Sequence, residues 1–188
     1  MLQEEEFCGD CLGKSASFEY GYSLFVYNSS LQDSIGRFKY HGRREYASFY
    51  AEELYREYGE WISQTGAEAL IPVPIHKNRF RTRGYNQAEL IARELGTLSG
   101  IPVWSRLLVR SRDTLPQKDL NHQERRENLS GAFLLGKQEG ELNQIPKCVI
   151  IIDDIYTTGS TVEVCSRVLK KAGVHKIYFL CVCIGKGI

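Results

Sequence analysis

The sequence predicts an α/β protein in which helices flank a parallel, twisted β-sheet. Near the carboxyl terminus, two continuous apolar runs, residues 147–153 and 176–184, enclose an amphipathic segment, residues 160–171. A strand, a helix and a second buried strand in this order form a βαβ unit, which requires a parallel sheet. A chain of 188 residues is long enough for one main domain with a small appendage.

The composition is that of an ordinary folded protein, with 43% hydrophobic and 25% charged residues. No apolar run approaches the roughly 18 residues that cross a bilayer, and residues 1–6 are acidic where a signal peptide would be basic. We therefore expect a cytoplasmic protein without membrane insertion. The net charge of +1 provides no global attraction to nucleic acid, so any DNA contact must come from a local basic cluster such as residues 79–83.

The amino-terminal part predicts a short appendage followed by a strand and two helices. Residues 1–17 contain little that could enter a core, so we treat residues 18–188 as the main domain. Residues 18–27 are rich in aromatic and β-branched side chains around a central glycine, which predicts a hairpin or a bent strand pair. Apolar residues then recur at helical spacing in residues 30–39 and again in residues 47–58.

The middle of the chain predicts a strand, a basic loop and a helix. Residues 69–74 form a short apolar run with two prolines, which indicates a strand that passes into a constrained loop. Residues 87–95 have helical spacing, and residues 101–104 form a candidate strand. Residues 112–128 are charged and lack a sustained apolar face, which favours a mobile functional loop.

Residues 149–161 have the clearest chemical signal. The apolar strand ends in Asp153 and Asp154, and a run of small residues then opens the next helix: Thr157, Thr158, Gly159, Ser160 and Thr161. The carboxyl edge of a parallel sheet is where open α/β folds bind ligands, and a helix start supplies unpaired N–H groups. Hydroxyl groups add donors, and glycine permits close backbone approach. We therefore expect residues 157–161 to bind a phosphate.

The two carboxylates predict a second part of the same ligand. Ionised Asp153 and Asp154 accept hydrogen bonds only, so they would repel a phosphate but hold the hydroxyls of a sugar. A phosphate on one side of the turn and a diol on the other describe a ribose 5-phosphate. The alternative is that the acids end the strand and the hydroxyls cap the helix. A helix cap ordinarily uses one such residue, whereas this segment has seven, the two acids and residues 157–161. We therefore favour ligand binding.

Residues 149–161 resemble the phosphoribosyl diphosphate signature of type I phosphoribosyltransferases. Three further blocks resemble the ComF (GntX-like) competence-associated branch of that superfamily: Ile71-Pro72-Val73-Pro74, Arg83-Gly84-Tyr85-Asn86-Gln87-Ala88, and Gln117 with Glu124-Arg125-Arg126-Glu127-Asn128-Leu129 and Gly131-Ala132-Phe133. The blocks span most of the chain from Phe38 onward. Their order and spacing make the resemblance fairly specific.

The resemblance implies that phosphoribosyl diphosphate binds with Mg²⁺ at the strand ends. Asp153 and Asp154 would be the catalytic acidic pair on the ribose diol, and residues 157–161 would hold the 5-phosphate. The loop from Pro74 to Gly84 would lie on the pyrophosphate side, where cations stabilise a leaving group that gains charge. Its candidate residues are Lys77, Arg79, Arg81 and Arg83. The same four side chains also fit a solvated basic face, an alternative that the sequence leaves open.

By the same resemblance, residues 112–128 would form a flexible loop that closes over the reaction centre and excludes water. Its candidate pyrophosphate contacts are Lys118, Arg125 and Arg126. An ordinary solvated loop has a similar composition, and the sequence does not decide between the two.

The cysteines form two groups with different expected roles. Four lie in apolar patterns and are expected to be buried thiols rather than disulfides: Cys148, Cys165, Cys181 and Cys183. Relatives in the ComF branch generally have paired C-x-x-C motifs, whereas this chain has only Cys8 and Cys11. A tetrahedral Zn²⁺ site needs four ligands, so this pair is incomplete. Three explanations stay open: the first half-site is missing, the pair is a vestige, or His41 and another residue complete the site. We do not expect an intact zinc site in this chain.

Three functions fit these residues. The first is an enzyme in which a nucleophile attacks the anomeric carbon and magnesium pyrophosphate leaves; no segment identifies the acceptor. The second is a non-catalytic binding module of the DNA-uptake machinery, for which the resemblance implies a helicase-like ATPase as partner, with single-stranded DNA as a further candidate. The third is a regulator that senses a nucleotide. Both carboxylates and the complete hydroxyl run are present, which favours retention of the phosphoribosyl diphosphate site.

Overall fold

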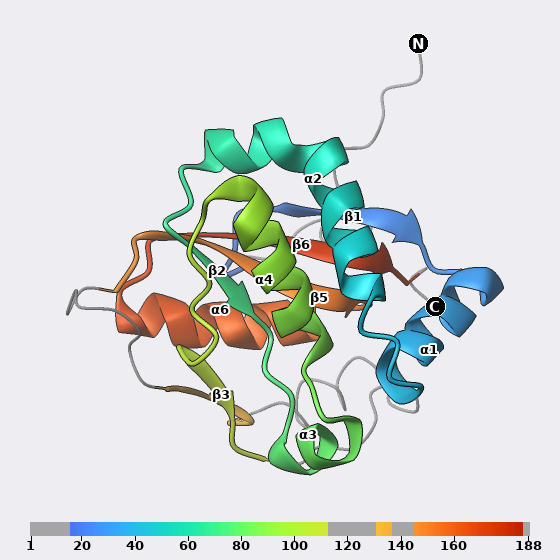
Figure 1. Ribbon diagram of the computed structural model, residues 1–188. Helices are drawn as coiled ribbons and strands as arrows, with labels where there is room; N and C mark the ends of the chain where they lie inside the picture. The colour runs from blue at the N-terminus through green and yellow to red at the C-terminus, as the bar shows by residue number, and fades with distance from the viewer. Residues whose placement is uncertain (1–15, 113–130, 137–144, 186–188) are drawn as a thin grey trace.

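The computed structural model describes residues 16–112, 131–136 and 145–185, and its centre is a four-stranded sheet (Figure 1). The strand order is β1–β6–β5–β2, and every neighbouring pair is parallel. The strands are β1 (Gly21–Val26), β2 (Ala69–Pro72), β5 (Cys148–Tyr156) and β6 (Lys176–Ile184). The predicted α/β class with a parallel sheet is confirmed.

Five helices and a short antiparallel ladder complete the described part of the chain. The helices are α1 (Ser29–Tyr40), α2 (Tyr46–Thr65), α3 (Lys77–Arg83), α4 (Gln87–Ser99) and α6 (Ser160–Ala172). The ladder pairs β3 (Leu108–Arg110) with β4 (Phe133–Leu135). Among the described helices, none is both long enough and apolar enough to span a membrane.

The sheet separates two apolar clusters, as Figure 1 shows with α2 and α4 on one face and α6 on the other. Successive side chains of a strand point to opposite faces. In β5, Val149 and Ile151 therefore pack in the cluster with α6, whereas Ile150 and Ile152 pack in the cluster with α1, α2 and α4. Burial on both faces explains why this strand is a continuous apolar run.

The connections that leave β5 and β2 run in opposite directions. From β5, the chain passes through α6 to β6, which is the neighbour on one side. From β2, it passes through α3 and α4 to Val103, which makes a single parallel bridge to Leu70 of β2, on the side away from β5. Because α4 and α6 cover opposite faces, the carboxyl ends of β5 and β2 form the topological switch point, where α/β folds of this kind bind ligands.

The prediction of a hairpin or bent strand pair in residues 18–27 is wrong, because this segment contains only the single strand β1. Gly21 does not form a turn there. A Cβ atom at this position would lie 2.1 Å from the carbonyl oxygen of Phe179 on β6. The glycine therefore permits close approach of two parallel strands, a role that glycine in a strand often has.

Two other predictions in the middle of the chain are also corrected. Residues 101–104 form no regular strand, since only Val103 makes a bridge. The helix expected at residues 87–95 continues to Ser99 and ends at Gly100, whose φ of 74° is in the left-handed region. The β3–β4 ladder was not predicted, because three residues are too few to show strand periodicity.

Candidate functional site

The turn between β5 and α6 presents hydroxyl groups at the switch point. Thr157 is exposed, Ser160 is buried, and the Thr158 and Ser160 hydroxyl oxygens lie 2.9 Å apart. Helix α6 begins after Gly159, which has no side chain that could cap the helix start. Unpaired N–H groups at a helix start carry a partial positive charge and can receive an anion. The turn therefore places hydroxyl groups beside a helix start, and phosphate binding there stays a prediction.

Gly159 is required at this turn for two independent reasons. Its φ is 71°, in the left-handed region that disfavours every residue with a Cβ atom. An added Cβ would also lie 2.4 Å from the hydroxyl oxygen of Tyr156. The Tyr156 ring cannot move away freely, because it stacks on Phe179 with ring centroids 4.7 Å apart. The conformation of the turn thus depends on this glycine.

Asp153 and Asp154 are half-buried at the carboxyl end of β5. The backbone N–H of Asp154 donates to Oδ1 of Asp153 over 2.8 Å. Strand alternation directs Asp153 to the α6 face and Asp154 to the α1 face. There, Nζ of Lys39 from α1 lies 2.7 Å from Oδ2 of Asp154. The two carboxylates therefore flank the strand end from opposite sides.

Asp153 has the most perturbed acidity of this site. Burial, and then the negative charge of Asp154, raise the pKa of Asp153 from 3.8 to about 7. The Asp154 backbone N–H, Lys39 and Arg110 act in the opposite direction. A carboxyl group with this pKa is partly protonated at neutral pH, and such groups are common in functional sites.

Four buried thiols lie on β5, α6 and β6. Cys148, Cys165, Cys181 and Cys183 are buried and free, as the sequence predicted. Burial, followed by the charge of Asp153, raises the pKa of Cys165, and burial followed by the charge of Asp154 raises that of Cys183 to about 12. These thiols remain protonated and pack as small apolar groups.

The basic segment after β2 was predicted to be a loop, but residues 77–83 form helix α3. His76 caps its start, with Nδ1 accepting from the Asn78 N–H over 3.3 Å, and Gly84 ends it with a φ of 78°. None of its residues is buried. Without a buried face the helix has no apolar periodicity, which is why the sequence did not reveal it.

Helix α3 divides the four predicted pyrophosphate-side cations between two faces. Residues four apart share a helix face, so Lys77 lies with Arg81, and Arg79 with Arg83. Arg83 donates to Oε1 of Gln87 over 3.1 Å and to the hydroxyl of Tyr40 on α1 over 3.2 Å. Its guanidinium carbon also lies 4.9 Å from the centre of the Tyr40 ring. The structure therefore does not bring all four cations to one place.

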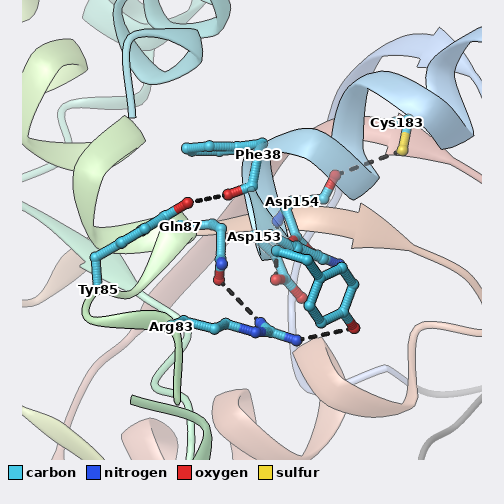
Figure 2. Close-up of polar contacts among 9 residues, drawn as sticks. Phe38, Arg83, Tyr85, Gln87, Asp153, Asp154 and Cys183 are labelled. Atoms are coloured by element: carbon cyan, nitrogen blue, oxygen red, sulfur yellow. Dashed lines mark hydrogen bonds and ion pairs between the residues drawn. The ribbon is translucent and has the colours of Figure 1, made fainter. Parts of the chain in front are cut away.

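Figure 2 shows the residues that join the acids to α3. In this view Arg83 donates to Gln87, and the Tyr85 hydroxyl donates to the carbonyl of Phe38 on α1. Lys39 and Tyr40, which follow Phe38, make the contacts to Asp154 and Arg83. Neither residue was among those predicted from the sequence. Their only local signal is basic charge in the last turn of α1, which by itself indicates a favourable helix-dipole interaction.

The other face of α3 borders an open groove of about 380 Å³. It lies between α3, the start of α4 and β3, and it is lined by Pro74, Ile75, Lys77, Phe80, Arg81, Asn86, Glu89, Ser105, Arg106, Leu108, Val109 and Arg110. Four of these side chains are cationic and one is acidic. Phe80 is 48% exposed beside Lys77 and Arg81. The groove therefore combines positive charge with an accessible aromatic ring.

Several predicted residues lie outside the part of the chain that the structure describes. They are Cys8, Cys11, Lys118, Arg125 and Arg126. His41, the residue considered as an extra zinc ligand, is exposed and ends α1. Within residues 16–112, 131–136 and 145–185, no three His, Cys, Asp or Glu side chains gather as a metal site.

Comparison with known proteins identifies relatives along most of the chain, although no family model matches it. Competence protein F of Haemophilus influenzae is 34% identical over 173 residues, which cover 90% of this chain and 75% of the relative. DNA utilization protein YhgH of Escherichia coli O157:H7 is 31% identical, covering 94% and 77%. Competence protein ComFC of Streptococcus pneumoniae is 30% identical, covering 82% and 64%.

Among solved structures, a purine phosphoribosyltransferase from Pyrococcus horikoshii Ot3 matches with a TM-score of 0.37 and 22% identity, covering 74% of this chain and 71% of that chain. A match this loose adds nothing to the argument. The sequence relatives are closer, because two of them exceed 30% identity and are covered by this chain over three quarters of their length. The chain belongs to the ComF family of competence and DNA-utilization proteins, as its motifs predicted.

Proposed function

We propose that this protein binds phosphoribosyl diphosphate at the carboxyl ends of β5 and β2. The observation that carries the proposal is the β5–α6 turn, in which two half-buried carboxylates precede a left-handed Gly159, a pair of hydroxyls and the start of a helix. The helix start and the hydroxyls suit the 5-phosphate. The carboxylates suit the ribose hydroxyls, because an ionised carboxylate accepts hydrogen bonds and a diol donates them.

The charge distribution also supports a ligand with a second anionic group. Lys39 lies beside Asp154, and Arg83 reaches Tyr40, the residue next to Lys39. A sugar with its hydroxyls at the acids and its 5-phosphate at α6 would direct its anomeric substituent toward these cations. A diphosphate at that position would gain two charge-assisted contacts.

Magnesium fits this proposal as part of the ligand. The described residues hold no ready-made metal cage, and Mg²⁺ is commonly bound through substrate phosphates with one or two carboxylates. Asp153 and Asp154 are the side chains that would face it. When bound, it would neutralise the diphosphate and stabilise it as a leaving group.

Isothermal titration with phosphoribosyl diphosphate, with and without magnesium, tests the proposal. We expect specific binding that strengthens with magnesium, and weaker binding of ribose 5-phosphate, which lacks the diphosphate. Inorganic phosphate should bind more weakly still, because it contacts only the α6 turn. Equal affinities for all three ligands, or no binding of any, would contradict the proposal.

Transfer of the phosphoribosyl group needs a separate test, because binding does not establish turnover. If the protein is an enzyme, attack of a nucleophile at the anomeric carbon forms a new glycosidic bond and releases pyrophosphate. A screen of bases and amines for pyrophosphate release would identify the acceptor. Binding of the diphosphate sugar with no release from any acceptor would favour the non-catalytic interaction module.

We also propose that the groove beside α3 contacts single-stranded DNA. Single-strand sites combine cationic side chains, which contact phosphates, with aromatic rings, on which bases stack. Phe80, Lys77 and Arg81 provide this combination, and neither cation has a hydrogen-bond or ion-pair partner within the described residues. The relatives named for competence and DNA utilization make DNA a reasonable ligand class.

Gel-shift titration at several salt concentrations tests the groove. The variant Lys77→Ala/Arg81→Ala should weaken binding to single-stranded DNA and reduce the log–log salt slope by about 1.4, because each lost phosphate contact accounts for about 0.7. The control Arg56→Ala/Lys171→Ala removes the same charge from α2 and α6. Identical slopes for the two variants would show that the groove is not the contact surface.

A further inference from the structure

Lys39 has a position that no sequence motif explains. It lies in the last turn of α1 next to Phe38, which is fully buried in the cluster beneath α1. Its side chain is 18% exposed and that of Asp154 is 13% exposed, so most of this ion pair is removed from water. The pair joins α1 directly to the carboxyl end of β5.

This ion pair is poorly explained as a stabilising device. Removing two charges from water costs free energy that their attraction only partly offsets, so such pairs contribute little net stability. Phe38 and Ile35 already anchor α1 in the core. A lysine that only capped the end of α1 would be equally favourable in solvent. Its burial against Asp154 therefore needs a different explanation.

The hydrogen-bonding capacity of Lys39 is largely unused. An ammonium group has three donors, and within the described residues its one partner is Asp154. The next residue, Tyr40, holds Arg83 of α3 by a hydrogen bond and by its ring face. The end of α1 therefore contacts both Asp154 and the basic end of α3, and Lys39 has donors left for an anion.

We propose that Lys39 is a specificity-determining residue of this site, whose ammonium holds Asp154 without ligand and contacts the diphosphate of phosphoribosyl diphosphate when it binds. This inference rests on the proposed function. Two carboxylates next to a diphosphate would repel it, and a shared ammonium reduces that repulsion. Ribose 5-phosphate has only a neutral hydroxyl at this position. Lys39 should therefore favour the diphosphate sugar over the monophosphate.

The test compares two ligands in matched variants by isothermal titration with magnesium present. Lys39→Gln removes the charge but can still donate to Asp154, Lys39→Met removes both, and Lys39→Arg keeps the charge. Affinity for phosphoribosyl diphosphate should fall roughly 10- to 100-fold in the Gln and Met variants, the loss typical of one charge-assisted hydrogen bond. Affinity for ribose 5-phosphate should stay the same or increase, because Asp154 is released. The Arg variant should retain most of the diphosphate affinity.

The control is Lys170→Met, which removes a lysine whose Nζ lies 3.7 Å from Glu19, on the far part of α6. Equal losses for the two ligands in the Gln variant would show that Lys39 only supports the structure, and would overturn the inference. No loss for either ligand would also overturn it. If the wild-type protein bound neither sugar phosphate, the proposed function itself would fail. The two failures are therefore distinguishable.

Discussion

Replacing both Asp153 and Asp154 with asparagine is expected to lower the affinity for phosphoribosyl diphosphate by about 100-fold or more, because two charge-assisted hydrogen bonds to the diol are lost. Affinity for inorganic phosphate should change little or increase, since the β5–α6 turn is intact and two negative charges beside it are gone. Isothermal titration of both ligands measures the difference. The selectivity of the loss, more than its size, identifies the diol as the group that the acids hold.

The single variant Asp153→Asn provides the folding control. The pKa of Asp153 in the folded protein is about 7, above its ordinary value of 3.8. Between these values the folded state binds more protons than the unfolded state, so ionisation of Asp153 lowers stability as pH rises toward 7. Asparagine carries no such charge, and the variant should unfold at a higher temperature than wild type at pH 8 but not at pH 4. Equal loss of both ligands in the double variant would show that the acids only maintain the turn.

The part of the fold that sequence predicted best is the β5–α6–β6 unit, for a physical reason. Burial on both faces makes β5 an uninterrupted apolar run, and one buried stripe gives α6 its helical spacing. Both signals are local, so a single sequence contains them completely. The start of α6 at Ser160 was predicted correctly, whereas β5 continues to Tyr156, three residues beyond its predicted end at Asp153.

The errors occurred where local signals are absent or ambiguous. Gly21 suggested a turn, but glycine is needed there because an added Cβ would lie 2.1 Å from the carbonyl oxygen of Phe179 on β6. Helix α3 was predicted to be a loop because it buries no residue. Both features depend on tertiary structure: Gly21 is needed because of a strand far away in the chain, and α3 lacks a face that packs in the core.

The missing part of the candidate site has the same origin. Asp154 and Lys39 lie on elements far apart in the chain, and nothing near Lys39 indicates its partner. Helix α3 likewise separates Lys77 and Arg81 from Arg83, although all lie in one basic segment. A sequence shows that cations are available, whereas the backbone geometry decides which of them share a surface.

Replacing Gly159 with alanine is expected to lower affinity for phosphoribosyl diphosphate, ribose 5-phosphate and inorganic phosphate together. A left-handed conformation costs an alanine about 1–2 kcal/mol, which already corresponds to roughly 5- to 30-fold if the turn is reshaped to relieve it. The new Cβ would also lie 2.4 Å from the Tyr156 hydroxyl, so the loss should exceed this range. Titration of the three ligands distinguishes this uniform loss from the selective loss in the acid-pair variant.

The matched control for this substitution is Gly173→Ala at the other end of α6. Gly173 has a φ of 103°, but no atom lies within 4 Å of its added Cβ, so alanine there is strained without a clash. It should lower the unfolding temperature and leave ligand affinity unchanged. The double variant Gly159→Ala/Tyr156→Phe removes the clashing hydroxyl and retains the backbone strain, so it should recover part of the binding. If Gly159→Ala binds all three ligands as wild type does, the turn does not hold a phosphate, because no phosphate that depends on its N–H groups could tolerate that change in the backbone.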